Sequence, residues 1–137
     1  MSTLRHLDHW KLPENAQKSL RRLDDAMTAA SKFDNLGSGI ELCKDTSVDA
    51  ILSEVLVVLK IDELVGSSYG TSLWRISGPE ARILHNSPGP AYLYPMRVHD
   101  GKLPAISNKP VDIGSAMCIL ERVTITPGLN CLVVSTL

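Results

Sequence analysis

The chain has 137 residues, of which 44% are apolar and 21% charged, and its formal net charge is −1. This composition is typical of one folded domain with its own core, and it excludes a disordered chain. A near-neutral charge and few aromatic residues give no general basis for nucleic-acid binding, and no uncharged apolar run is long enough to span a membrane.

The first ten residues lack an apolar core of signal-peptide length. Three cysteines without a CxxC pair favour an intracellular protein with reduced thiols, so we expect a cytoplasmic location. His6 and His9 have a helical spacing but no further ligands beside them, so we expect a loosely ordered terminus without a metal site.

An amphipathic helix is predicted to begin at Pro13 and to continue to the glycines at positions 37 and 39. Its apolar residues recur at spacings of four and three, which favours one face packed on the domain itself and leaves a short coiled-coil seam as the alternative. The residues of this face are Ala16, Leu20, Leu23, Met27, Ala30, Phe33 and Leu36.

A second helix is predicted after Thr46, which together with Asp49 resembles a capping box. A broad apolar stripe follows over residues 48–59, while its β-branched residues leave a strand over residues 54–61 as the competing interpretation. Residues 66–70, rich in glycine and serine, form the best candidate linker in the chain.

Short strands are predicted beyond this linker, over residues 72–77, 81–85 and 91–99. Pro95 lies inside the third segment, which predicts that this strand is either an edge strand or bulged in the middle. Four arginines fall on or beside the proposed strands and could line a basic groove, although scattered solvent-facing arginines on a half-buried sheet are the favoured interpretation; they are Arg75, Arg82, Arg97 and Arg122.

The closing run predicts an antiparallel hairpin, because two β-branched segments, residues 116–126 and 129–137, flank the turn at Pro127 and Gly128. A final strand of this kind leaves an edge that another subunit could cover, so we expect a homo-oligomer. The expected interface residues are Leu20, Leu23 and Met27 of the first helix and Leu132 and Val134 of the final strand.

Together these patterns predict an α+β fold with two N-terminal amphipathic helices packed on a mainly antiparallel C-terminal sheet or small sandwich. Residues 1–66 would form the helical segment and residues 67–137 the β-rich segment of one compact domain. No complete catalytic, metal or cofactor motif occurs in either segment, so an enzyme is not favoured.

The last third resembles the opening of the dUTPase and dCTP deaminase family of trimeric jelly-roll proteins. A strand leads into a loop that ends in Leu-Pro at residues 103–104, a small-residue segment follows at residues 112–120, and strand and turn segments of the family's type lie at residues 123–128 and 131–137. The resemblance implies a jelly-roll-like sheet and, at the signature segment, a nucleotide site at Asp112, Gly114 and Ser115. The family's later catalytic segments have no counterpart in this chain.

We therefore expect a non-catalytic structural or protein-interaction protein, for which the resemblance suggests a viral origin. It would assemble through its helices and its C-terminal edge strand. A dUTPase-like protein that binds or hydrolyses deoxynucleotides is the alternative. A nucleic-acid-binding protein that uses the cations of the first helix is the second alternative, although neighbouring Asp24 and Asp25 offset those charges; the cations are Lys18, Arg21, Arg22 and Lys32.

Overall fold

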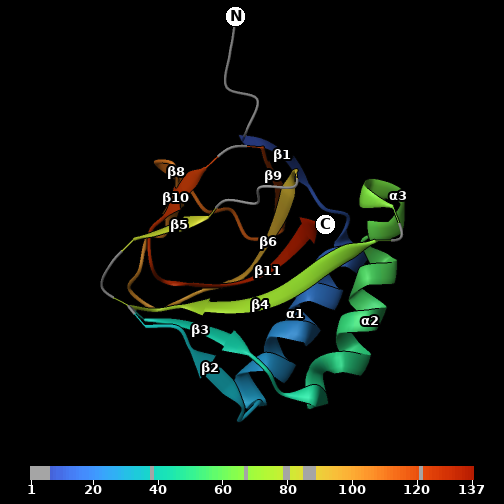
Figure 1. The fold of residues 1–137 in the computed structure, drawn as a ribbon, viewed down its shortest axis with the longest axis horizontal. Helices are drawn as coiled ribbons and strands as arrows, with labels where there is room; N and C mark the ends of the chain where they lie inside the picture. Colours follow the sequence, from blue (N-terminus) through green and yellow to red (C-terminus); the bar gives the residue numbers. More distant parts are fainter. Residues whose placement is uncertain (1–6, 38, 67, 79–80, 85–88, 121) are drawn as a thin grey trace, which may run out of the picture.

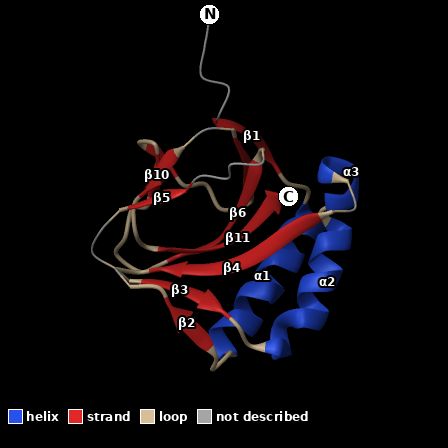
Figure 2. Cartoon of the chain, in the orientation of Figure 1, coloured by secondary structure: helices blue, strands red, loops and turns tan. Residues whose placement is uncertain are grey.

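The computed structural model describes the chain apart from residues 1–6, 38, 67, 79–80, 85–88 and 121. Figure 2 separates its helices from its strands. The helical elements are α1 (Glu14–Ala29), η1 (Thr46–Val48), α2 (Asp49–Val58) and α3 (Ile61–Val65). The strands are β1 (Leu7–Lys11), β2 (Phe33–Asn35), β3 (Ile40–Cys43), β4 (Tyr69–Ile76), β5 (Arg82–Leu84), β6 (Ala91–Val98), β7 (Ala105–Ile106), β8 (Lys109–Pro110), β9 (Ser115–Ile119), β10 (Val123–Ile125) and β11 (Leu129–Thr136).

The elements form three layers (Figure 1). The middle layer is a seven-stranded sheet in the order β1-β9-β6-β11-β4-β3-β2, and the outer sheet has the order β5-β10-β7-β8. The helices cover one face of the large sheet, and the small sheet packs on the other. The predicted combination of helices with mainly antiparallel sheets is thus confirmed, because every strand pair among the described residues is antiparallel.

The large sheet is buried on both faces, and its central strands show this in their alternation. In β11, Leu132 and Val134 belong to the core under the helices, whereas Cys131 and Val133 belong to the core between the two sheets. Burial raises the pKa of Cys131 to about 12, so its thiol stays protonated. One strand therefore supplies two separate cores.

The predicted closing hairpin is wrong. β10 pairs with β5 and β7 in the small sheet, whereas β11 pairs with β4 and β6 in the large one. At Gly128, which has φ +115°, the backbone N–H donates to the carbonyl of Ile76 at 2.7 Å and draws the chain onto β4. The turn thus connects two sheets. The expected C-terminal edge strand is also wrong, because β11 lies in the middle of its sheet.

The N-terminal segment contains strands as well as helices, which corrects the purely helical expectation for residues 1–66. α1 ends at Ala29, and Phe33 and Leu36 belong to the β2–β3 hairpin rather than to the helix. β1 forms one edge of the large sheet through its pairing with β9, so His9 lies on a strand and not in a loose terminus. His6 lies outside the described residues.

The second predicted helix is confirmed over the competing strand, although its start differs. The side chain of Asp45, not that of Thr46, accepts from the N–H of Ser47 at 3.0 Å and begins η1. α2 follows η1, and Lys60 in a left-handed conformation, with φ 56°, separates α2 from α3. None of the helices described is both long and apolar enough for a membrane crossing.

Pro95 produces a bulge, one of the two outcomes that the sequence predicts, and not an edge, because β6 lies between β9 and β11. Opposite Asn130 and Cys131, the register of β6 passes from Arg97 to Pro95 and skips Met96. A bulge of this kind turns a side chain toward the other face of the sheet. Tyr94, Met96 and Arg97 consequently all lie toward the helices.

Candidate functional site

A buried polar network connects α1 to β6 and β11. Asp24, with only 3% of its surface exposed, accepts from Arg97 Nε at 2.5 Å through Oδ2 and from Asn130 Nδ2 at 2.9 Å through Oδ1. The amide oxygen of Asn130 lies 2.9 Å from His99 Nε2. Both oxygens of the buried carboxylate are thereby used, as the burial of a charged group requires.

The order of donors along this network follows from its chemistry. The carboxylate of Asp24 only accepts, so the amide nitrogen of Asn130 faces it and the amide oxygen faces His99. Nε2 of His99 must therefore carry a hydrogen. The hydrogen bond to Asp24 is the main cause that raises the pKa of Arg97, and burial opposes it.

The polar network was missed at the level of sequence, although two signals pointed to it. Asp24 falls four residues after Leu20 and three before Met27, on the apolar face of α1. Asn130 interrupts the apolar sequence of β11. A polar residue at an apolar position indicates a buried partner, but nothing local tells which residue that partner is.

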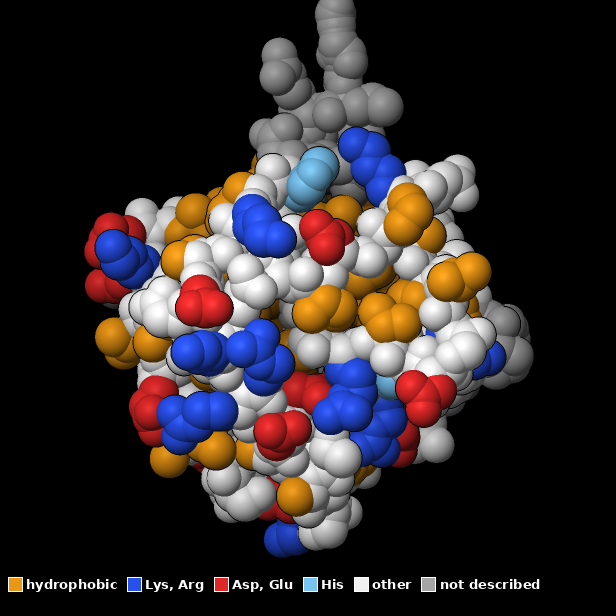
Figure 3. Space-filling view, turned by 180° about the vertical axis from the view of Figure 1, so that it is seen from behind, with side chains coloured by type: hydrophobic (Ala, Val, Ile, Leu, Met, Phe, Trp, Pro, Cys, Tyr) orange, Lys and Arg blue, Asp and Glu red, His pale blue; other side chains and the backbone are white. Residues whose placement is uncertain are grey.

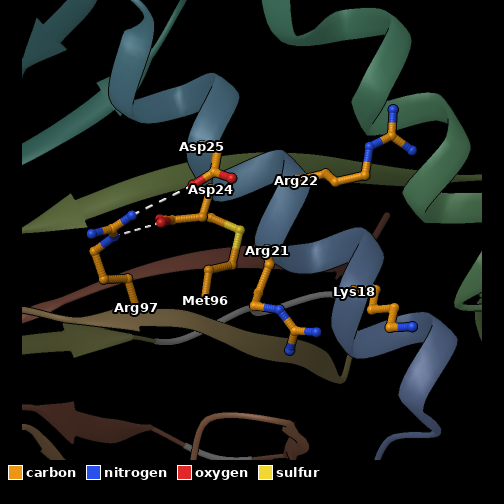
Figure 4. Close-up of a pocket in the computed structure, with 7 residues that line it drawn as sticks. All are labelled: Lys18, Arg21, Arg22, Asp24, Asp25, Met96 and Arg97. Carbon is orange, nitrogen blue, oxygen red and sulfur yellow. Dashed lines mark hydrogen bonds and ion pairs between the residues drawn. The ribbon is translucent and has the colours of Figure 1, made fainter.

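Above this network lies an open hollow of about 560 Å³ between α1 and β6 (Figure 4). On the face shown in Figure 3, Lys and Arg side chains gather with acidic ones among them. The sequence placed three of the lining cations together on α1, while Lys32, the fourth expected cation, does not line the hollow. The hollow is lined by Lys18, Arg21, Arg22, Asp24, Asp25, Met96 and Arg97.

The charged side chains that line the hollow differ in whether they form ion pairs. Arg22 points away toward α2 and pairs with Glu54 at 3.3 Å (Figure 4). Arg97 pairs with Asp24 and lies 3.7 Å from Asp25 through Nη2. Lys18 and Arg21 have no ion-pair partner within the described part of the chain.

The residues expected to bind a nucleotide lie elsewhere, at a smaller pocket of about 220 Å³. Ser115 Oγ donates to Asp112 Oδ2 at 2.9 Å, and both residues line the pocket. Gly114, with φ +93°, instead binds the connection between β1 and α1, because its carbonyl accepts from Leu12 N at 2.8 Å. The remaining lining residues are His9, Pro95, Lys109, Pro110 and Met117.

The five expected interface residues all lie in the interior of the chain. Each has at most 3% of its surface exposed, and all belong to the core between the helices and the large sheet. The apolar spacing thus marked the face that the first helix buries on its own domain. The folded protomer does not offer these residues to a partner; they are Leu20, Leu23, Met27, Leu132 and Val134.

Apolar side chains are exposed instead on the helices α2 and α3. Val55 is the only fully buried residue of α2. Val57 has 76% of its surface exposed and borders a hollow of about 540 Å³. We call the lining of this hollow the α2–α3 surface; it consists of Ser53, Leu56, Val57, Lys60, Asp62, Glu63 and Tyr69.

Within the described residues, no group of three or more His, Cys, Asp or Glu side chains is placed to hold a metal ion. Comparison of the sequence with models of protein families and with curated proteins finds no match. What remains to indicate a function is the geometry of three surfaces: the hollow between α1 and β6, the smaller pocket at Ser115, and the α2–α3 surface.

Proposed function

We propose that this chain is a non-catalytic assembly protein that forms a homo-oligomer through the α2–α3 surface. The observation that carries the proposal is Val57, an apolar side chain with 76% of its surface exposed in the last turn of α2. Exposure of this apolar group to water costs free energy, and contact with another subunit would remove that cost. Leu56 and Tyr69 extend the apolar area beside it.

A second copy of the chain is the partner that the charges favour. Lys60 lies next to Asp62 and Glu63, and none of the three has an ion-pair partner among the described residues. A two-fold interface places the same surface against itself, so it needs both signs of charge. Around the apolar centre, Lys60 of one copy can face the two acidic side chains of the other.

The test is the molar mass in solution, measured by size-exclusion chromatography with light scattering over a range of concentrations. We expect a dimer or larger oligomer, and we expect Val57→Asp to shift it to the monomer. Leu103→Asp is the matched control, because Leu103 has 95% of its surface exposed and lies outside the α2–α3 surface. The control should leave the mass unchanged.

Charge exchange sharpens this test. Lys60→Glu should weaken the oligomer by placing like charges together, and adding Glu63→Lys should restore it, because the interface would again contain both signs. A strict monomer at high concentration would exclude the proposal. So would equal effects of Val57→Asp and Leu103→Asp.

Binding of a deoxynucleotide at the smaller pocket is a second candidate. It is supported by the polar side chains of Asp112, Ser115 and Lys109, which line the pocket together with the apolar Pro95 and Met117. At about 220 Å³ the pocket is below the usual range for whole ligands, so it fits a base or a sugar but not a complete nucleotide. Calorimetric titration with dUTP and dCTP tests this candidate, and the absence of binding would remove it.

A further inference from the structure

We propose that the hollow between α1 and β6 is a binding site for a phosphate group, held by Lys18, Arg21 and Arg97. The proposal is independent of the α2–α3 surface. It concerns Lys18 and Arg21, which have no ion-pair partner within the described part of the chain, together with Arg97, which Asp24 holds in place.

Arg97 is the fixed part of this site. Its Nε is bound to Asp24, which is buried and held in turn by Asn130, and its Nη2 lies near Asp25. Nη1 has no acceptor among the described residues, and 48% of the side chain is exposed. The guanidinium is thereby oriented before any ligand arrives, and the half-exposed side chain lines the hollow.

Lys18 and Arg21 supply the remaining positive charge. They lie three positions apart and therefore on one face of α1, about 4.5 Å apart along the axis. Figure 4 shows Arg21 between Lys18 and the Arg97 end of the hollow, while Arg22 points away. Several cations around one concave space suit a group with three or four oxygens, and guanidinium donors match phosphate geometry.

Asp25 is the residue that limits affinity. Its side chain is 77% exposed, so its charge opposes an anion without serving the buried network. Neutralising Asp25 should therefore tighten phosphate binding, whereas neutralising Arg21 should weaken it. Opposite effects of two neighbouring changes are a signature that general loss of stability does not produce.

The experiment is a calorimetric titration of the full chain with pyrophosphate at low ionic strength. We expect one site, about tenfold weaker binding in Arg21→Gln and in Lys18→Gln, and tighter binding in Asp25→Asn. Arg122→Gln is the matched control, because Arg122 is exposed and does not line the hollow. It should change the affinity less than twofold.

Two further arms distinguish the source of the phosphate. Competition between pyrophosphate and vesicles with phosphorylated headgroups would support the site and assign the phosphate to a lipid; pyrophosphate binding without vesicle binding would support it for a small phosphorylated molecule. Failure to bind pyrophosphate, equal losses in Arg21→Gln and Arg122→Gln, or binding of single-stranded RNA alone would overturn the proposal. None of these results depends on the oligomeric state.

Discussion

Asn130 donates a hydrogen bond to Asp24 across 106 residues of sequence and joins the first helix to the central strand of the large sheet. The two side chains are among the few buried polar groups of the described chain, and each completes the hydrogen bonding of the other. The bond fixes the position of α1 over the sheet. It also makes the base of the hollow rigid.

Loss of Asp24 should therefore destabilise the protein. Asp24→Ala leaves Asn130 with an unpaired buried amide and leaves Arg97 with the exposed Asp25 as its remaining ion-pair partner. Because Arg97 is half exposed, we expect a loss of about 2–3 kcal/mol in the free energy of unfolding, below the full cost of breaking a buried ion pair. Urea denaturation measures it. Asp25→Ala is the control, with an expected change within about 0.5 kcal/mol; equal losses would show that the buried network contributes nothing.

Asp45 should make stability depend on pH in the acid range. Backbone hydrogen bonds, first from Ser31 and then from Ser47, lower the pKa of Asp45 in the folded chain. A lowered folded pKa gives stability that is present above the ordinary value of about 3.9 and is lost as the pH falls below it. The melting temperature of Asp45→Asn should thus lie below that of the unchanged chain at pH 7 and approach it under acid conditions. A constant difference across this range would contradict the prediction.

Gly39 should tolerate no side chain. It has φ +77°, and a Cβ atom there would overlap the backbone of Gly78. Gly37, in the same turn, has φ +87° but open space around it. We expect Gly39→Ala to cost about 2–5 kcal/mol, from backbone strain and overpacking together, and Gly37→Ala about 1–2 kcal/mol from strain alone. Thermal and chemical unfolding of the two variants compare them, and a larger cost at Gly37 would contradict the packing of these loops.

A substitution at Leu132 should affect the packing of the core but not the assembly of the oligomer. Leu132→Ala removes a fully buried side chain and should cost about 2–5 kcal/mol of unfolding free energy without changing the molar mass of the folded protein. Val57→Asp should do the reverse, changing the molar mass at nearly unchanged stability. If Leu132→Ala dissociates the oligomer under conditions where the chain remains folded, the interface would involve β11 and not the α2–α3 surface.

Local patterns predicted the elements of this fold better than their arrangement. The period of α1 and the apolar stripe of α2 identified two helices, and Pro95 predicted either an edge strand or a bulge, of which β6 shows the bulge. The turn at Pro127 and Gly128 was found, but its role was not, because the same residues can connect strands within one sheet or between two. The pattern of apolar residues also does not distinguish an edge strand from a central one when both faces of the sheet are buried.

The candidate site was less accessible to sequence reasoning for a physical reason. Its network depends on contacts over 73 and 106 residues, and on a bulge that turns Arg97 from the small sheet toward α1. Lys18 and Arg21 were recognisable as cations on one helix. That Arg22 would turn to Glu54, and that Arg97 would join the other two, depends on the assembled structure.

The central place of β11 also constrains the order in which the molecule can form during synthesis. β4 and β6 are separated in the sheet by this strand, which follows both of them in sequence. A nascent chain that has not yet released residues 129–136 from the ribosome contains the two parts of the large sheet but nothing to join them. Closure of the sheet, and with it the hydrogen bond between Asn130 and Asp24, must follow translation of β11, and until then the facing edges of β4 and β6 stay unpaired.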